Sequence, residues 1–173
     1  MDLALFRFFN SFVGHGFDGV IVALASYLQY ALIALFIGAS LWPTRKYALL
    51  ISGLGAAFIA RFGVKTLIIT FVERARPYAA LPDAHAVISQ DAGEQLQSLP
   101  SGHAIFFFAL AMVAYRSDVR LGRWLFAGAT IMGIARVVGA AHWPFDILVG
   151  AFLGILVGYI ATIISAKLAP SSV

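Results

Sequence analysis

Five apolar stretches separated by polar segments set the pattern of this sequence. They occupy residues 20–41, 47–72, 102–115, 124–140 and 144–165. About 20 consecutive apolar residues in a helix cross the hydrocarbon core of a bilayer, so the pattern predicts membrane-spanning helices. The stretch at 102–115 is short for a span, and we expect its start to lie inside the membrane boundary or against a protein-lined cavity.

Residues 1–15 follow a different pattern. Apolar side chains recur at roughly helical spacing, with polar residues between them, at Leu3, Leu5, Phe6, Phe9, Phe12 and Val13. This spacing predicts an amphipathic helix that lies in the membrane interface. A cleaved signal peptide is disfavoured, because Asp2 is acidic and no basic segment precedes the apolar residues.

Composition narrows the class of protein further. Of 173 residues, 61% are hydrophobic and 12% are charged, whereas a soluble domain has roughly 25% charged residues. These values exclude a soluble enzyme, a disordered chain, a collagen-like rod and a disulfide scaffold. We therefore expect an all-α fold: an integral membrane helical bundle of five to six helices with an N-terminal interfacial helix. The length predicts a single membrane-embedded domain over residues 1–173.

Charge predicts how the bundle is oriented. If the chain crosses the membrane five times, one end of the bundle carries six basic residues and one acidic residue, Asp118. The basic residues are Arg45, Lys46, Arg116, Arg120, Arg123 and Lys167. The positive-inside rule makes this end cytoplasmic and the other end extracytoplasmic. The net charge of +4 is spread over short loops and helix ends, so we expect no nucleic-acid partner. The chain has no cysteine, which excludes a disulfide, a thiolate nucleophile and a cysteine metal site.

Three polar islands, at residues 73–77, 100–103 and 136–146, fall at the predicted extracytoplasmic ends of the spans. They hold arginines, two histidines and an aspartate. Arginine offers a planar, permanently charged fork that matches phosphoryl oxygens. Such a set in a bundle without thiols suggests binding of a phosphate and attack on it.

The second island leads into a predicted helix. The free N–H groups at the start of this helix, and the positive end of its dipole, would face any anion placed beside Ser101 and Gly102. Gly102 lets the backbone approach that anion closely. His103 would stand next to it, able to give or take a proton.

The third island leads into the last predicted helix. Pro144 suits a first helical position, which puts His142 just before the helix and Asp146 in its first turn. An aspartate there can accept a hydrogen bond from one imidazole nitrogen and leave the other free to attack. The pattern therefore predicts a histidine nucleophile oriented by a carboxylate.

These residues also carry a family resemblance. The Pro-Ser-Gly-His motif at residues 100–103, followed by Arg136, His142 and Asp146 in the pattern Arg-x5-His-x3-Asp, resembles the type-2 phosphatidic acid phosphatase superfamily. That superfamily comprises membrane-embedded, metal-independent lipid phosphatases and their soluble vanadate-haloperoxidase relatives. Two motifs with the correct order and spacing, each at a helix end, make the resemblance specific.

The resemblance implies a role for each residue. His142 would be the nucleophile that forms a phosphohistidine, and Asp146 would orient it. His103 would protonate the leaving oxygen and then activate water. The phosphoryl oxygens would be held by Arg76, Arg136, Ser101 and Gly102. Neither a metal nor another cofactor is implied.

The family's first motif, Lys-x6-Arg-Pro, fits only in part. Arg76 is followed by proline, but Ile69 occupies the lysine position. On a straight helix Lys65 lies within about 20° of the same face and about 6 Å deeper. Two residues are candidates to replace the missing charge: Lys65, by extending its side chain towards the interface, or Arg74.

Two further features fall inside the spans. Arg61 lies within an apolar stretch, where a charge costs at least ~2.5–3.5 kcal/mol, and we expect a structural ion pair for it. Gly150, Gly154 and Gly158 form a small-xxx-small pattern that predicts close helix packing within the bundle.

The expected function is that of a lipid phosphatase in a bacterial inner (cytoplasmic) membrane, with its site facing the periplasm or cell exterior. The short chain and interfacial helix look like small bacterial undecaprenyl-diphosphate phosphatases of this superfamily, so undecaprenyl diphosphate is the first choice of substrate. Phosphatidylglycerol phosphate, phosphatidic acid and lipid A 1-phosphate stay open. A non-catalytic lipid-binding or transport protein is the alternative, favoured by Ile69 alone. The expected partners are the lipid substrate and the bilayer, and the oligomeric state is open.

Overall fold

The structure of the chain is a computed structural model that describes residues 1–42, 46–88 and 92–168. Regular structure in these ranges is helical, apart from one isolated bridge between Arg74 and Gln97. Among the described residues, four helices are long and apolar enough to cross a membrane, namely Asp18–Leu41, Tyr47–Ile69, Val119–Val138 and Pro144–Leu168. The apolar helix Gly102–Ser117 is shorter. The predicted all-α membrane bundle is confirmed.

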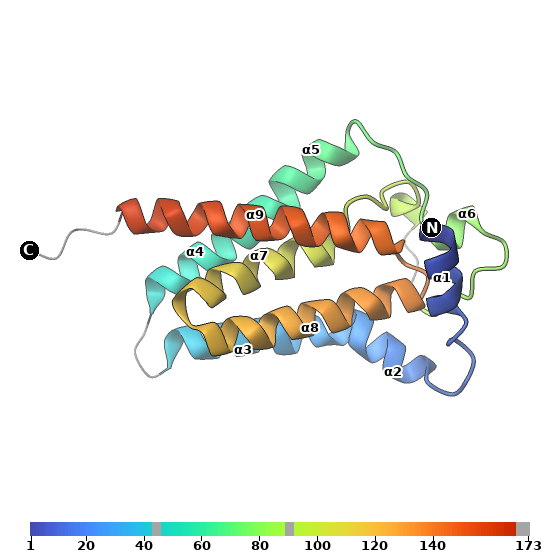
Figure 1. Cartoon of the computed structure of the whole chain (residues 1–173), viewed down its shortest axis with the longest axis horizontal. Coiled ribbons are helices and arrows are strands. Elements are labelled where there is room, and N and C mark those ends of the chain that lie inside the picture. Colours follow the sequence, from blue (N-terminus) through green and yellow to red (C-terminus); the bar gives the residue numbers. More distant parts are fainter. Residues whose placement is uncertain (43–45, 89–91, 169–173) are drawn as a thin grey trace, which may run out of the picture.

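The elements follow one another in a simple order (Figure 1). The first helix is α1 (Asp2–Asn10). The first span comprises α2 (Asp18–Val22), the π-helix η1 (Ala23–Tyr27) and α3 (Leu28–Leu41). The second comprises α4 (Tyr47–Phe58), the π-helix η2 (Ile59–Val64) and α5 (Lys65–Ile69). The polar segment after it contains α6 (Pro77–Ala80) and the 3₁₀-helix η3 (Ala92–Glu94). The remaining helices are α7 (Gly102–Ser117), α8 (Val119–Val138) and α9 (Pro144–Leu168).

Helix α7 runs through the centre of the bundle. It packs against α4, α8 and α9, and Ile105, Ala109 and Leu110 have no exposed surface. Figure 1 shows that α7 begins inside the end of the bundle at which α8 ends and α9 begins. The short apolar stretch at residues 102–115 therefore begins against protein. This is what we expected of a stretch too short to cross the bilayer.

Glycines on α9 let it approach α7 closely. A Cβ atom added at Gly154 would lie 2.5 Å from the backbone oxygen of Ile105, and one at Gly158 would lie 2.6 Å from that of Ala109. At Gly150 it would lie 2.9 Å from the Cβ of Ala104. The small-xxx-small pattern thus packs two helices of the same bundle against each other, as predicted.

The first helix, α1, lies across one end of the bundle. Phe6 is 1% exposed and packs against Trp143, with ring centroids 5.2 Å apart. The Asn10 amide donates to the carbonyl oxygen of Val138 at 2.7 Å. The opposite face exposes apolar side chains, namely Leu3, Leu5, Phe8 and Phe12. One face of the predicted amphipathic helix therefore docks on the bundle, and the other is free for the membrane interface.

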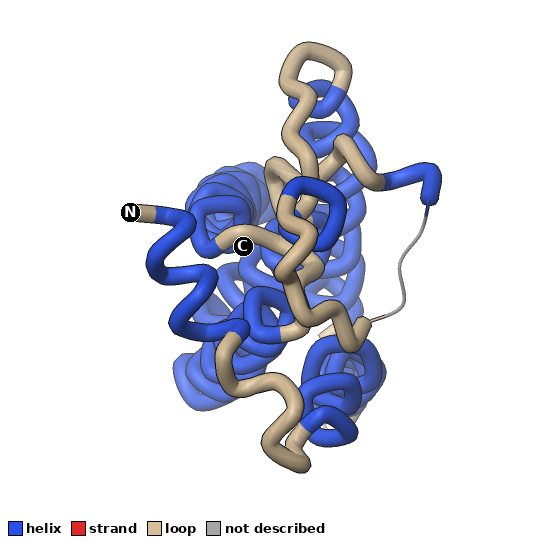
Figure 2. Tube along the Cα trace, turned by 90° about the vertical axis from the view of Figure 1, so that its right-hand side faces the viewer, coloured by secondary structure: helices blue, strands red, loops and turns tan. Residues whose placement is uncertain are grey.

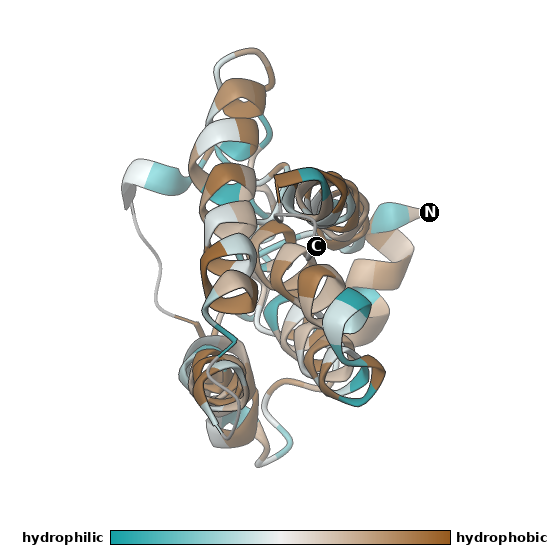
Figure 3. Cartoon of the chain, turned by 90° about the vertical axis from the view of Figure 1, so that its left-hand side faces the viewer, coloured by the Kyte–Doolittle hydropathy of each residue, from teal (hydrophilic) through white to brown (hydrophobic). Residues whose placement is uncertain are grey.

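Apolar side chains also cover the outside of the long helices. Ile51, Leu67, Leu148 and Phe152 are each more than half exposed, and Figure 3 shows hydrophobic turns on every long helix. Such a surface fits a hydrocarbon surrounding. Figure 2 views the bundle from the other end, where loops and α1 cover it.

The end opposite α1 is basic. The start of α4, the connection between α7 and α8 and the end of α9 meet there (Figure 1), and they carry Lys46, Arg116, Arg120, Arg123 and Lys167. Arg45 lies outside the described residues. Asp118 accepts hydrogen bonds from the backbone N–H groups of Arg120 and Leu121, which lower the pKa of its carboxyl and cap α8.

Replacement of Gly154 by valine tests the α7–α9 contact. The new side chain has no room beside the Ile105 carbonyl, so the variant should lose about 1–3 kcal/mol of stability. The measurement is the thermal unfolding midpoint in detergent. Leu148→Val, on the exposed face of the same helix, is the matched control. Equal midpoints for the two variants would contradict the packing assigned to Gly154.

Candidate active site

The three polar islands meet at the end of the bundle covered by α1. Here α5 has ended, α7 begins, and a short turn joins α8 to α9 (Figure 1). The Ser101 backbone N–H donates to the Asp146 carbonyl at 3.1 Å, and Arg76 Nη1 donates to the Ala141 carbonyl at 3.3 Å. Residues far apart in the sequence are therefore in direct contact at one place.

His142 lies at the bottom of this site and is 1% exposed. Its Nδ1 is 3.0 Å from the carbonyl oxygen of Ser98, and its Nε2 is 3.5 Å from Nη1 of Arg76. A carbonyl oxygen can only accept, so Nδ1 carries the proton of the neutral ring. Nε2 is then unprotonated, and its lone pair accepts from Nη1 of Arg76.

The aspartate expected to hold this ring is slightly too far away to do so. Asp146 Oδ2 lies 3.7 Å from His142 Nδ1, beyond hydrogen-bond distance. The direct partner is the backbone carbonyl of Ser98, which sequence reasoning missed because a backbone oxygen has no residue signature. Asp146 acts on the His142 ring indirectly, through Ser98, because its Oδ2 accepts from the Ser98 hydroxyl.

The electrostatic surroundings of His142 favour its neutral form. Burial lowers the pKa of its imidazole to about 3, and the positive charges of Arg136 and Arg76 act in the same direction. The ring is therefore uncharged at neutral pH. A neutral imidazole with Nδ1 protonated and Nε2 unprotonated is the form required of a nucleophile.

Asp146 organises the turn before α9. It has no exposed surface, and its carboxylate accepts from the Ser98 hydroxyl, the Trp143 backbone N–H and Nη1 of Arg74. These donors compensate the loss of water around the buried charge. Arg74 thus pairs with this carboxylate rather than with Nε2 of His142.

Arg74 and Arg76 lie on an extended segment that is bridged to residues 95–98. The N–H groups of Arg74 and Arg76 donate to the carbonyls of Leu96 and Gln95, at 2.9 and 2.8 Å. Residues two apart in an extended chain share a face, so both guanidinium groups lie over the turn before α9. Arg76 is held in place by Glu94, through Nε to the backbone oxygen at 2.9 Å and Nη2 to the carboxylate.

Two basic side chains of the second span pack on the start of α7. A Cβ atom at Gly102 would lie 2.9 Å from Nη1 of Arg61 and 3.4 Å from Cδ of Lys65, so both side chains lie directly against the backbone at the start of this helix. The Ser101 hydroxyl accepts from the Ala104 N–H at 3.4 Å as the helix cap. In the described part of the chain, the N–H groups of Gly102 and His103 make no hydrogen bond.

These positions correct two expectations. The helix carrying Lys65 ends at Ile69, and η2 precedes it, so a straight helix does not connect Lys65 to Arg76. Lys65 nevertheless reaches the site from within the span. Among the described residues Arg61 makes no ion pair within 4.0 Å, so the structural ion pair expected for it is not found there.

Arg136 is 8% exposed near the end of α8. Its Nη1 donates to the Ala25 carbonyl at 3.0 Å. Ala25 belongs to the π-helix η1, whose wider turns leave carbonyls available to other donors. Its Nε is buried and has no hydrogen-bond partner in the described structure. A buried guanidinium donor without a partner is unusual and fits a site whose ligand supplies the acceptor.

His103, in the first turn of α7, contacts a residue of the first span. Its Nε2 lies 3.2 Å from Oε1 of Gln29. His103 is also in the electrostatic neighbourhood of Arg136, Arg61 and His142. The structure thus brings the predicted site residues together at one end of the bundle, with Arg74 bonded to Asp146 rather than to His142.

Four residues at the site were not predicted, namely Gln29, Arg61, Glu94 and Ser98. Arg61 had a signal, because a charge inside an apolar stretch requires a partner or a cavity. The other three are a single glutamine, a loop glutamate and a serine backbone carbonyl, and only the folded chain reveals their positions.

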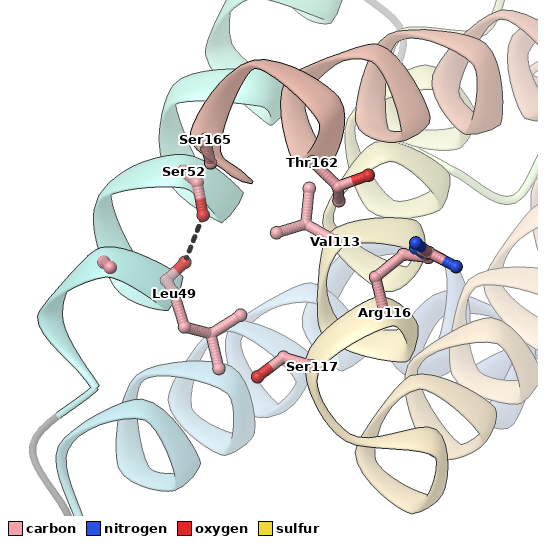
Figure 4. A pocket seen from close by; sticks show the side chains of 8 residues that line it. Leu49, Ser52, Val113, Arg116, Ser117, Thr162 and Ser165 are labelled. Atoms are coloured by element: carbon pink, nitrogen blue, oxygen red, sulfur yellow. Dashed lines mark hydrogen bonds between the residues drawn. The ribbon is translucent and has the colours of Figure 1, made fainter. Parts of the chain in front are cut away.

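A second cavity, of about 200 Å³, lies at the basic end of the bundle (Figure 4). Three of its polar side chains have partners within the chain. Ser52 Oγ bonds to the Leu49 carbonyl at 3.3 Å, Thr162 Oγ1 to the Tyr159 carbonyl at 2.7 Å, and Arg116 lies over the Tyr159 ring. Of the residues that the structure describes, no histidine or carboxylate lines it, unlike the site around His142.

The bundle and this site define a class, the multi-pass membrane lipid phosphatases. The chain belongs to the PAP2 superfamily, whose family model matches residues 46–169. It is therefore a phosphoric monoester hydrolase that acts on membrane lipids, and the resemblance found in the sequence is confirmed.

Individual relatives are similar to different extents. Bacitracin transport permease protein BcrC of Bacillus licheniformis is 26% identical over 159 residues, which cover 90% of this chain and 76% of that protein. Lipid A 1-phosphatase of Porphyromonas gingivalis is 37% identical over 70 residues, 38% of this chain and 16% of that protein.

Two crystal structures have a similar fold. LpxE of Aquifex aeolicus matches with a TM-score of 0.74 and 25% identity, over 92% of this chain and 93% of that one. The PAP2-type phosphatidylglycerolphosphate phosphatase of Bacillus subtilis matches with a TM-score of 0.69 and 19% identity, over 98% and 87%. The second likeness concerns the fold alone.

The protonation of His142 can be checked directly. Because burial lowers its pKa to about 3, the ring should stay neutral, with Nε2 unprotonated, as the pH falls from 8 to about 4.5. The measurement is ¹⁵N NMR of histidine-labelled protein, with the His142→Gln variant assigning the signal. Conversion to imidazolium near the unperturbed value of about 6.5 would contradict this prediction.

Proposed function

We propose that the protein hydrolyses the terminal phosphate of a membrane lipid through a phosphohistidine on His142, with undecaprenyl diphosphate as the first choice of substrate. The observation that carries this proposal is the buried, neutral His142, whose Nε2 faces Arg76. The partnerless Nε of Arg136 belongs to the same electrostatic neighbourhood. A phosphoryl group beside Nε2 would supply the acceptor that Nε of Arg136 lacks and would lie next to the guanidinium of Arg76.

The reaction has two steps. His142 Nε2 attacks phosphorus, the P–O bond to the lipid phosphate breaks, and His103 gives a proton to the leaving oxygen. Water then attacks the phosphohistidine, His103 takes the proton from that water, and inorganic phosphate leaves. Gln29, bonded to Nε2 of His103, fixes the orientation of that ring. Asp146 and the Ser98 carbonyl keep the proton of His142 on Nδ1.

Several positive groups surround the position assigned to the phosphoryl group. Arg76 and Arg136 lie on the His142 side, and Arg61 and Lys65 lie over Gly102 at the start of α7. Phosphoryl transfer depends mostly on such preorganised positive charge. In this proposal Arg61 and Lys65 together supply the charge that the family motif places at the position of Ile69.

An apolar groove beside the site supports a lipid substrate. A cavity of about 220 Å³ is lined by Ile33, Phe58, Phe62, Phe106 and Phe107, with Gln29 and Arg61 also in its wall. Gln29 contacts His103, and Arg61 packs on Gly102. A chain in this groove would place its phosphate among the basic groups.

The proposal also covers location and extent. The basic end of the bundle is assigned to the cytoplasm by the positive-inside rule, so the site would face the periplasm or cell exterior of a bacterial inner membrane. Residues 1–173 would form one membrane-embedded domain. Lipid A 1-phosphatase and the phosphatidylglycerolphosphate phosphatase are named for different lipids, so these relatives do not select the lipid.

A second candidate is a non-catalytic transport or lipid-binding protein. The specific observations in its favour are Ile69 at the lysine position and the similarity to BcrC, which is named a bacitracin transport permease protein. Against it, binding alone requires neither a neutral, oriented His142 nor a second histidine beside it.

Phosphate release from a lipid panel tests the proposed function. Detergent-purified protein with EDTA should release phosphate from undecaprenyl diphosphate faster than from phosphatidylglycerol phosphate, phosphatidic acid or lipid A. His142→Ala should reduce the rate to background and still bind lipid. Faster release from another lipid would overturn the substrate, and no release from any lipid would favour the transport protein.

Glu94 supplies a further prediction. Its carboxylate bonds to Nη2 of Arg76 and is the acid in the electrostatic neighbourhood of Arg61 and Lys65. It therefore occupies an anion position that a phosphoryl oxygen needs. The side chain is 42% exposed, so it can turn outward when substrate binds.

Glu94→Gln removes this competing charge and keeps the shape of the side chain. We expect KM for the lipid and the inhibition constant for inorganic phosphate to fall together, by about fivefold or ~1 kcal/mol. Asp83→Asn, in an exposed ion pair, is the control. A higher KM in Glu94→Gln would mean that the carboxylate positions Arg76 and does not compete with phosphate.

A further inference from the structure

The first helix, α1, makes a direct ionic connection to the site. Asp2 Oδ1 accepts from the backbone N–H of Phe145 at 3.0 Å, in the first turn of α9. Its Oδ2 accepts from Nη2 of Arg74, and Nη1 of the same guanidinium donates to Asp146. One side chain of α1 therefore binds both the start of α9 and the arginine that neutralises the buried carboxylate.

Arg74 is well suited to this bridging position. Its planar fork presents separate N–H groups, in a fixed geometry, to the two carboxylates. The guanidinium also lies 5.6 Å from the ring of Trp143 and 5.8 Å from that of Phe145. Its side chain is 27% exposed, whereas that of Asp146 is 0% exposed.

The connection continues to His142. Asp146 accepts from the hydroxyl of Ser98, and the carbonyl of Ser98 holds Nδ1 of the imidazole. The chain of contacts thus runs from Asp2 through Arg74, Asp146 and Ser98 to the ring. Each link is a hydrogen bond of the folded protein.

Two other contacts of α1 act on the same turn. Phe6 packs against Trp143, the residue after His142. Asn10 donates to the carbonyl of Val138, the last residue of α8. The helix therefore contacts both ends of the α8–α9 turn, which carries the imidazole of His142.

We propose that Asp2 and Arg74 are positioning residues: through them α1 locks the α8–α9 turn and sets the orientation of His142 for attack. This inference rests on the proposed function only in taking His142 as the nucleophile. Because the outward face of α1 is apolar, the same helix would link seating in the membrane interface to the geometry of the site.

The test compares Asp2→Ala, Asp2→Asn, Arg74→Lys and Arg74→Gln with the wild type. We expect kcat to fall about 10- to 100-fold, with KM for the lipid changed by less than about threefold. Asp2→Asn keeps an oxygen that accepts from the Phe145 N–H, but it removes the negative charge that faces Arg74. Its kcat should therefore lie between those of the wild type and Asp2→Ala. Arg7→Gln is the matched control, because Arg7 lies on the same helix in an exposed ion pair with Asp83.

A merely structural role for α1 predicts something different. Asp2→Ala would then lower the thermal midpoint, and the folded fraction would keep wild-type kcat and the wild-type ¹⁵N signal of His142. The positioning role predicts an altered His142 signal. It also predicts that Asp2→Ala and Arg74→Gln lose less together than the product of their separate losses.

These experiments distinguish a failure of the positioning role from a failure of the proposed function. If the wild type is active and His142→Ala is inactive, unchanged kcat in Asp2→Ala overturns the positioning role alone. If Asp2→Ala does not fold, Asp2→Asn and Arg74→Lys decide, and wild-type kcat in both rejects the proposal. If the wild type is inactive on every lipid, the His142 signal still reports whether Asp2 orients the ring.

Discussion

The buried carboxylate of Asp146 is the interaction on which the rest of the site depends. A charge without exposed surface is stable only if hydrogen bonds and an opposite charge replace its water. The Ser98 hydroxyl, the Trp143 N–H and Arg74 provide these partners, and they come from separate segments. Satisfying one carboxylate therefore joins the polar loop, the extended arginine segment and α9, and this fixes His142.

The positive groups are arranged by interruptions in the helices. The π-helix η1 leaves the Ala25 carbonyl to receive Arg136, and η2 contains Arg61 and directly precedes Lys65. Regular α-helices would use their carbonyls internally and keep a fixed angular spacing. The wider turns of the two π-helices thus place Arg136 and Arg61 where regular α-helices would not.

The sequence predicts most of the fold, because apolar length and glycine spacing act locally. The spans, the amphipathic first helix and the packing at Gly154 all follow from such patterns, whereas the docking of the first helix on the bundle does not. The site motifs likewise predict that His103 and His142 meet. What they do not predict depends on backbone path: the helix ends at Ile69, so Lys65 and Arg74 take positions that a straight helix does not give.

The departure at Ile69 shows why position in space matters more than position in a motif. A positive group is needed near the start of α7, and the side chain can come from any element that passes it. In this chain two residues of the second span, Arg61 and Lys65, pack on Gly102. Their long side chains reach upward from within an apolar helix, which keeps charge at the site and hydrocarbon around the span. The altered motif is therefore compatible with the proposed phosphate site, because two cations of the second span lie beside the helix start at Gly102.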